Sequence, residues 1–216
     1  MRKVLFAIGE YYHIFNRSIA GYKIYNESTN YMRFIKLLNY YRFVDNVLSY
    51  SRYLTTARAT ISKGFGGETL VDIIAYCVMP THFHLLIRQN TENGIAEYLS
   101  KIENSYSKYF NTIYKRKGPL WESRFQSVHI DTNEQLLHLT RYIHLNPSSA
   151  GLVKRPEQWK FSSYSEYIGN KNTSICTFKD LIELTPKQYK KFVNDRIAYQ
   201  KELSIIKSQL IDSYSG

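Results

Sequence analysis

The chain has 216 residues, and its 29 Lys and Arg outnumber its 18 Asp and Glu, which gives a formal net charge of +11 and a pI near 9.5. Its 44% apolar composition excludes an intrinsically disordered chain, and its two cysteines exclude a disulfide scaffold or a cysteine-rich zinc site. No apolar run reaches the roughly 18–20 residues of a membrane helix, and the first ten residues lack a signal-peptide cleavage pattern. We therefore expect a cytoplasmic protein with reduced thiols and no membrane partner, whose charge attracts a polyanion, nucleic acid first of all.

The first part of the chain predicts a strand, a helix and a hairpin. Aromatic and β-branched residues at 4–16 predict the strand. Apolar residues spaced by three and four over 30–54 predict an amphipathic helix, and the Gly-rich end of 55–69 is typical of a loop. Two apolar runs, 71–79 and 82–87, lie on either side of a Pro-Thr pair and predict a hairpin of largely buried strands.

The next part predicts a helix, a strand and a further helix. The helical spacing returns over 95–113, and a basic segment with a Gly-Pro pair ends it. A short strand is expected at 125–130. Thr132 is a suitable N-cap for a last core helix, which we expect to run to about Leu145 and to stop at the Asn-Pro pair that follows.

This order of elements predicts an α+β fold. A strand, a helix, two strands, a helix and a strand make a ferredoxin-like βαββαβ core, with an antiparallel sheet and its helices on one face. We assign residues 1–150 to this core and 151–216 to a C-terminal extension. The extension is expected to begin with short turns and to hold one or two polar helices within 178–211.

The pair His82 and His84 is the first candidate for chemistry. Residues i and i+2 of a strand point to the same face, so the two imidazoles project side by side while Phe83 turns into the core. Two neighbouring imidazoles are a good geometry for one metal ion. The alternative is two ordinary histidines, although polar groups on an apolar central strand need partners.

The second candidate is the end of the last core helix. Tyr142 and Asn146 are four residues apart and share a helix face, and His138 lies on the same stripe. A phenol can act as a covalent nucleophile when a base, a metal or a polarised target assists it. The alternative for Tyr142 is a half-buried packing role, as for most of the 20 tyrosines.

The second predicted helix and the segment after it are basic. Aromatic residues are interleaved with the cations, a pattern typical of a surface that binds single-stranded nucleic acid. The alternative is a solvated helix face with its aromatic residues in the core. The cations of this segment are Lys101, Lys108, Lys115, Arg116, Lys117 and Arg124.

Several stretches resemble one family in its own order. The run from Ala75 to Leu86 resembles the His-hydrophobic-His strand of single-tyrosine HUH transposases, and the run from Arg141 to Pro147 resembles their catalytic helix. Residues 12–17, 120–125 and 159–164 extend the resemblance over about 10–170. The branch resembled most is that of the REP-associated tyrosine transposases, relatives of small insertion-sequence transposases.

The resemblance implies a DNA nicking and strand-transfer enzyme that acts on single-stranded or hairpin DNA. Tyr142 would attack a phosphate, form a 5′-phosphotyrosine and free a 3′-hydroxyl. His82, His84 and Asn146 would hold a divalent metal, Mg²⁺ or Mn²⁺. Because the covalent link conserves the energy of the broken bond, the reaction needs no ATP.

Further roles follow as expectations. His13, Asn16 and Arg17 would support the site or contact DNA together with the cations of the basic segment. His138 would lie beside Tyr142 and support it without contacting the substrate. A monomer and a homodimer both remain open, and residues 171–216 would be a second DNA contact or a dimer arm.

Two other functions remain open at this stage. The same topology serves nucleic-acid-binding modules without catalysis, so the chain could be a domesticated transposase relative that only binds. A His-x-His metallohydrolase using activated water is the third possibility, although it lacks the extra acidic ligands of such sites.

Overall fold

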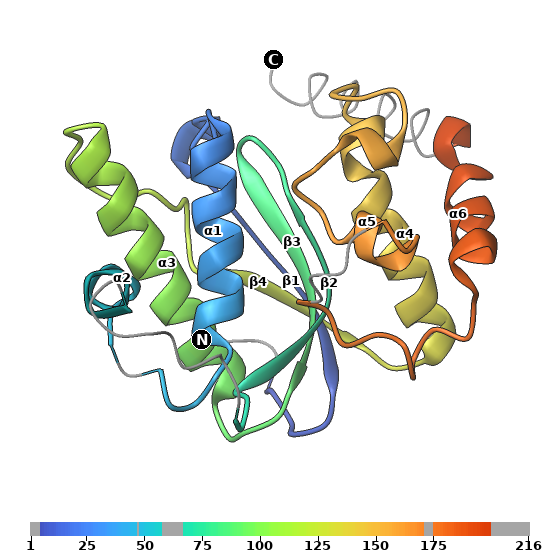
Figure 1. Cartoon of the computed structure of the whole chain (residues 1–216), viewed down its shortest axis with the longest axis horizontal. Helices are drawn as coiled ribbons and strands as arrows, with labels where there is room; N and C mark the ends of the chain where they lie inside the picture. Colours follow the sequence, from blue (N-terminus) through green and yellow to red (C-terminus); the bar gives the residue numbers. More distant parts are fainter. Residues whose placement is uncertain (1–4, 47, 58–66, 171–174, 200–216) are drawn as a thin grey trace, which may run out of the picture.

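A computed structural model describes residues 5–46, 48–57, 67–170 and 175–199. Its centre is a four-stranded antiparallel sheet with the strand order β2-β3-β1-β4, which confirms the predicted α+β class (Figure 1). The strands are β1 (Tyr11–Arg17), β2 (Val71–Val78), β3 (His82–Gln89) and β4 (Gln126–Ile130).

Strand β3 carries a different set of side chains on each face of the sheet. Phe83, Leu85 and Ile87 belong to the hydrophobic core on one face, whereas His82, His84 and Leu86 alternate with them and point to the other. In the β1–β3 pairing, Phe15 lies opposite His84 and Arg17 lies opposite His82. The pleat therefore separates the imidazoles from the larger core.

One face of the sheet is covered by α1 (Ser28–Tyr41) and α3 (Gly94–Ile113), with α2 (Tyr50–Ala57) beside them (Figure 1). These helices bury aromatic side chains, and their phenols find backbone partners: Tyr98 donates to the carbonyl of Leu38 and Tyr106 to that of Ile24. Helix α3 starts at Gly94, where only glycine fits, because a Cβ there would lie 2.4 Å from the carbonyl oxygen of Leu70.

The prediction of a single helix over 30–54 is wrong. Helix α1 ends at Tyr41, and the chain then pairs with the segment before β2: the amide of Val44 donates to Glu68, and the amide of Leu70 donates to Arg42. These bonds hold the backbone extended, so the helical spacing resumes only in α2. Residues 58–66 of the predicted loop lie outside the described part of the chain.

The expectation of helices on one face holds only for α1 and α3. The second face is covered by α4 (Asn133–Ser149), α5 (Tyr164–Tyr167) and α6 (Pro186–Asn194), as Figure 1 shows. Strand β2 is apolar on both sides, so Ile74 and Cys77 form a second core together with these helices. Two short 3₁₀ turns, Ile19–Gly21 and Pro156–Gln158, complete the described elements.

Helix α4 differs from its prediction at the C-terminal end. Thr132 is its N-cap as expected, because the Thr132 side chain accepts a hydrogen bond from the amide of Gln135. The helix runs through Pro147 to Ser149 instead of stopping near Leu145. Proline lacks only one amide in this last turn, and the amides that follow still close the end of the helix.

The remaining boundaries are close to their predictions. The first strand begins at Tyr11, and residues 1–4 lie outside the described residues. Of the polar helices expected within 178–211, α6 is described, whereas 200–216 are not. None of the described helices is both long and apolar enough to span a bilayer. Neither Cys77 nor Cys176 forms a disulfide, and both are buried.

Candidate active site

Three histidines from two neighbouring strands meet on the sheet face that carries α4. His82 and His84 come from β3 and His13 comes from β1. The Nε2 of His13 lies 3.0 Å from the Nδ1 of His84, and the hydroxyl of Thr81 lies 3.0 Å from the Nδ1 of His82. The rings of His82 and His84 are 5.1 Å apart and nearly perpendicular.

These hydrogen bonds involve the same nitrogen of both β3 imidazoles. Since the Nδ1 atoms of His82 and His84 are occupied by Thr81 and His13, their Nε2 atoms are the ones available to a cation. Imidazole ligands of metals commonly use their second nitrogen in this way, which fixes the tautomer and the ring orientation. His13 and Thr81 therefore support the pair.

The environment keeps the three imidazoles neutral. Burial lowers the pKa of His13 to about 4. Burial and the nearby charge of Arg17 lower the pKa of His82 to about 4. Burial and the two neighbouring imidazoles hold the pKa of His84 well below its usual range. A metal needs the unprotonated form of its ligand, so all three side chains are in the right state at neutral pH.

Tyr142 of α4 faces this cluster. Its ring centroid lies 5.7 Å from that of His84 and 6.2 Å from that of His13, nearly perpendicular to both rings. The side chain keeps 37% of its surface exposed, so a substrate can reach it. Burial raises the pKa of the Tyr142 phenol, and a hydrogen bond with the Asn146 side chain opposes that shift. The phenol is thus protonated at neutral pH.

Asn146 lies one helical turn beyond the tyrosine. Its Nδ2 donates to the backbone carbonyl of Tyr142 at 2.9 Å, which orients the amide. Among the described residues no group of three His, Cys, Asp or Glu side chains could hold a metal ion. The residues that would hold a cation are the two imidazoles and this amide. The amide oxygen suits a hard cation such as Mg²⁺ or Mn²⁺, whereas imidazoles favour softer divalent ions.

His144 fixes the tyrosine helix, a role that the sequence did not indicate. It is fully buried, with Nδ1 2.7 Å from the hydroxyl of Tyr189 on α6 and Nε2 2.8 Å from the hydroxyl of Ser163 next to α5. Burial lowers its pKa to about 3. Because Ser163 also bonds the backbone of Tyr76 in β2, this contact connects α4, α6 and the sheet.

Arg17 lies on the strand next to His82. It is exposed, lies opposite His82 in the strand pairing, and forms a two-point ion pair with Glu122. The chain between α3 and β4 lies at the same end of the sheet, because the amide of Ile19 bonds to Leu120 and the amide of Ser18 to Thr81. This segment carries Lys115, Arg116, Lys117 and Arg124.

Four of the expected residues do not join this cluster. Asn16 points to the opposite face, where its Nδ2 donates to Glu103 at 2.8 Å and it is only 4% exposed, so the expectation of a DNA contact is wrong for this residue. The contacts of His138 are with Arg141, Glu134 and Phe192, not with the histidines. The other two, Lys101 and Lys108, lie on α3, in the helical layer behind the sheet.

Comparison with known proteins identifies similar sequences and a similar fold. Residues 45–146 match the family described as transposase IS200 like, and this span includes His82, His84, Tyr142 and Asn146. A Haemophilus influenzae protein assigned to the REP-associated tyrosine transposases is 27% identical over 103 residues, which are 43% of this chain and 58% of that protein. The match thus spans less than two thirds of the relative.

The fold is similar to that of a solved structure. It shows a REP-associated tyrosine transposase bound to a REP hairpin, and it matches with a TM-score of 0.55 over 86% of this chain and 95% of that one. Its 16% sequence identity makes this a likeness of fold. Taken together, these findings show that the chain is similar in sequence to IS200-like transposases over residues 45–146, just under half of its length, and similar in fold to a REP-associated tyrosine transposase.

Proposed function

We propose that this protein is a metal-dependent DNA nicking and joining enzyme that acts on single-stranded hairpin DNA through a phosphotyrosine. One observation carries the proposal: the partly exposed ring of Tyr142 faces His84 and His13, beside the pair His82 and His84. A protein that only binds DNA has no need for a phenol aimed at paired neutral imidazoles. The hairpin-bound homologue supports DNA as the substrate.

The residues that would hold a cation are His82, His84 and Asn146. A bound Mg²⁺ or Mn²⁺ supplies charge stabilisation to the oxygens of the phosphate under attack. Neutral imidazoles add no repulsion against such a cation, and the bonds from His13 and Thr81 hold the two rings in place beforehand. This arrangement reduces the reorganisation that binding would otherwise need.

The chemical step itself belongs to Tyr142. Its Oη forms a bond to phosphorus, while the bond from phosphorus to the 3′-oxygen of the preceding nucleotide breaks. The 5′-phosphate stays on the tyrosine, and the proton lost by the phenol is balanced by the proton gained at the freed 3′-hydroxyl. The same hydroxyl, or one from another strand, can then attack the phosphotyrosine and restore a phosphodiester.

Arg17 and the cations between α3 and β4 are the proposed phosphate contacts near the site. Among these residues, Arg17 lies directly opposite His82 in the β1–β3 strand pairing. Its ion pair with Glu122 is exposed, so it costs little to exchange that carboxylate for a phosphate. Lys115, Arg116, Lys117 and Arg124 extend the positive rim.

We also infer that the sheet is of the ferredoxin-like type. The strand order β2-β3-β1-β4, with α1 and α2 between β1 and β2 and α3 between β3 and β4, supports this topology. The C-terminal extension, beginning after residue 150, would then serve to hold the tyrosine helix through His144.

The proposal is tested by incubating the protein with a labelled single-stranded hairpin DNA and Mn²⁺, followed by a denaturing gel. A covalent protein–DNA adduct is expected for the wild type, and it should be absent in Tyr142→Phe and in His82→Ala. Tyr199→Phe is the matched control, because Tyr199 is also exposed and lies outside the site. Mn²⁺ binding measured separately should weaken in His82→Ala and in Asn146→Ala, and stay unchanged in Tyr142→Phe.

The two alternative functions, a metallohydrolase and a DNA-binding protein without catalysis, predict different results in this assay. Cleavage without an adduct would indicate a metallohydrolase with activated water, and binding without cleavage would indicate a domesticated binding protein. Either result, or an adduct that persists in Tyr142→Phe, would refute the proposal.

A further inference from the structure

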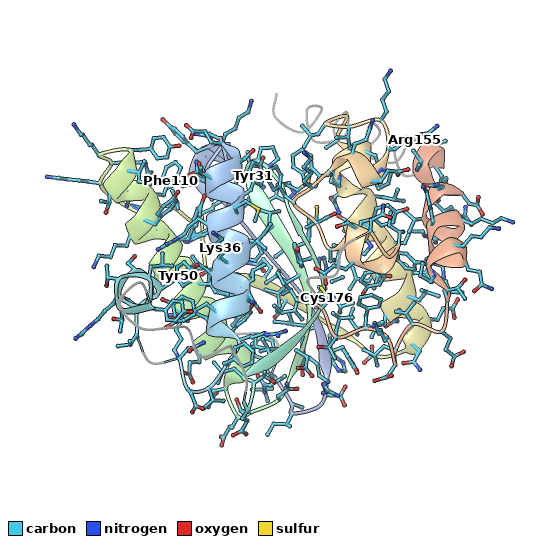
Figure 2. The ribbon with its side chains drawn as sticks, in the orientation of Figure 1. Tyr31, Lys36, Tyr50, Phe110, Arg155 and Cys176 are labelled. Atoms are coloured by element: carbon cyan, nitrogen blue, oxygen red, sulfur yellow. The ribbon has the colours of Figure 1, made fainter. Side chains whose placement is uncertain are left out.

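Two neighbouring hollows open on the helical layer behind the sheet. The larger, of about 500 Å³, lies between α3 and the start of α2, and the smaller, of about 390 Å³, lies between α1 and α2. Tyr109 of α3 lines both, and Tyr50 of α2 lines the smaller one. Figure 2 shows Tyr50 and Lys36 on the α1–α3 side of the sheet. Together the hollows form one surface, which we call the rear groove.

The rear groove carries cations and neutral hydrogen-bonding groups among aromatic and apolar side chains, which include Met32, Leu54 and Ile113. Lys101 and Lys108 line the larger hollow, and Arg33 and Lys36 line the smaller one. Hydroxyl and amide groups from α1, α2 and α3 lie between them, and no Asp or Glu lines either hollow within the described residues. A groove of this composition favours an anionic ligand that can accept several hydrogen bonds.

Few carboxylates offset these charges. Lys101 pairs with Glu97 on its own helix at 2.7 Å. The ion pairs found among the described residues leave Arg33, Lys36 and Lys108 without a carboxylate. The Arg33 guanidinium instead lies over the rings of Tyr50 and Tyr109, at 4.4 and 4.9 Å, and donates to the Ser51 hydroxyl. Its positive charge is therefore held in place by aromatic rings and a hydroxyl group, with no carboxylate paired to it among the residues that the structure describes.

The groove is separate from the candidate active site. Helix α3 buries Tyr98, Ile102 and Tyr106 against the sheet, which leaves Lys101 and Lys108 on its outer side. The histidines and Tyr142 lie on the other face of the same sheet. A ligand in the groove thus cannot touch the reacting phosphate, but a long nucleic acid could contact both faces around one end of the sheet.

We propose that the rear groove is a second DNA-binding site, which holds the phosphodiester backbone of the substrate away from the nicked position. The spaced cations would pair with successive phosphates, and the hydroxyl groups would donate to their oxygens. The choice of DNA as the ligand depends on the proposed function, whereas the existence of an anion-binding groove follows from its lining residues. The duplex stem of a hairpin and the single strand beside it share this backbone, and the experiment separates them.

The test measures how the affinity for DNA depends on salt, with Tyr142→Phe as the background and a chelator present, so that no chemistry occurs. The groove variant is Lys36→Gln with Lys108→Gln, two exposed residues whose loss opens no cavity. The control variant is Lys154→Gln with Lys160→Gln, which removes the same charge at exposed positions between α4 and α5. Three probes are compared: a full hairpin, its stem as a linear duplex, and its flanking single strand.

Each lost phosphate contact lowers the slope of log affinity against log salt by about 1. The groove variant should therefore lower the slope by about 2 on the hairpin and on whichever shorter probe occupies the groove. The control variant should leave all three slopes unchanged. Equal slopes for the groove variant and the background protein, or an equal decrease in the control, would overturn the inference.

Cross-linking adds a measurement of position. Both natural cysteines are buried, so a photoreactive label on Asn104→Cys in the groove reacts at one defined place. It should cross-link the hairpin, whereas a label on Asn170→Cys, at an exposed position just after α5, should not. If adducts form at Tyr142 but the groove tests fail, only the proposal of the rear groove is refuted. If the groove tests succeed but no adduct forms, only the catalytic proposal is refuted.

Discussion

Glu103 is a buried acid whose protonation should set the pH dependence of stability. It lies on α3, and its Oε1 accepts a hydrogen bond from the Nδ2 of Asn16 at 2.8 Å. Burial raises the pKa of this carboxyl to about 7, and the bond from Asn16 opposes the shift. The unfolded chain has no such burial, so there the carboxyl keeps its ordinary pKa of 4.5.

The direction of the effect follows from where the proton is held. Between the two pKa values the folded protein keeps the proton that the unfolded chain has released. The contribution of Glu103 to stability is therefore fully present below pH 4.5 and is lost as the pH rises through 7. Glu103→Gln keeps an oxygen acceptor for Asn16 but cannot ionise, so the variant should not show this loss.

The size of the effect follows from the two pKa values. A shift from 4.5 to about 7 corresponds to at most about 3.4 kcal/mol, at about 1.36 kcal/mol per pH unit. Most of this range lies between pH 5 and pH 8, where the expected change is about 2.5 kcal/mol. Urea unfolding of both proteins at these pH values, with a chelator present, measures it directly.

We expect the difference in unfolding free energy between Glu103→Gln and the wild type to rise by about 2.5 kcal/mol from pH 5 to pH 8 in favour of the variant. Glu183→Gln, at an exposed position, controls for the change in net charge. A difference that stays constant across this range would show that Glu103 ionises normally in the folded protein, and the reasoning from burial would be wrong.

Three further substitutions test the framework around the site. His144→Leu should lower the unfolding free energy by about 2–4 kcal/mol, because the buried hydroxyls of Tyr189 and Ser163 each lose a hydrogen bond; a loss below about 1 kcal/mol in urea unfolding would contradict this. Gly94→Ala should lower Tm although alanine favours helices, since its Cβ would lie 2.4 Å from the Leu70 carbonyl; a higher Tm would disprove the steric argument. Thr132→Ala should cost about 1 kcal/mol through the lost N-cap, and Thr132→Ser should restore the value of the wild type.

The site could be predicted from local spacing, because its key contacts repeat a period. His82 and His84 share a face since strands have a period of two, and Tyr142 and Asn146 share one since helices have a period near four. The packing of α4 against that face depends on tertiary contacts, which local spacing does not predict. It depends on helices covering both faces of the sheet, whereas the sequence predicted helices on one face only.

The errors arose where long-range contacts decide the structure. The split of the predicted helix depends on backbone bonds from Val44 and Leu70 to residues more than twenty positions away. Asn16 was placed with its neighbours His13 and Arg17, but strand alternation turns it toward Glu103. His144 gave no local signal, because its partners Tyr189 and Ser163 lie in the C-terminal extension.

The alternation of β3 also has a consequence for how this protein can evolve. Each residue of the strand belongs either to the larger core or to the side that carries the imidazoles. Deletion of a single residue before His82 would move every later side chain to the opposite face. It would bury both imidazoles among α1 and α3 and expose Phe83 to the substrate. Insertions and deletions in β3 should therefore disrupt folding and the candidate site together. The exposed cations, by contrast, can be substituted one at a time.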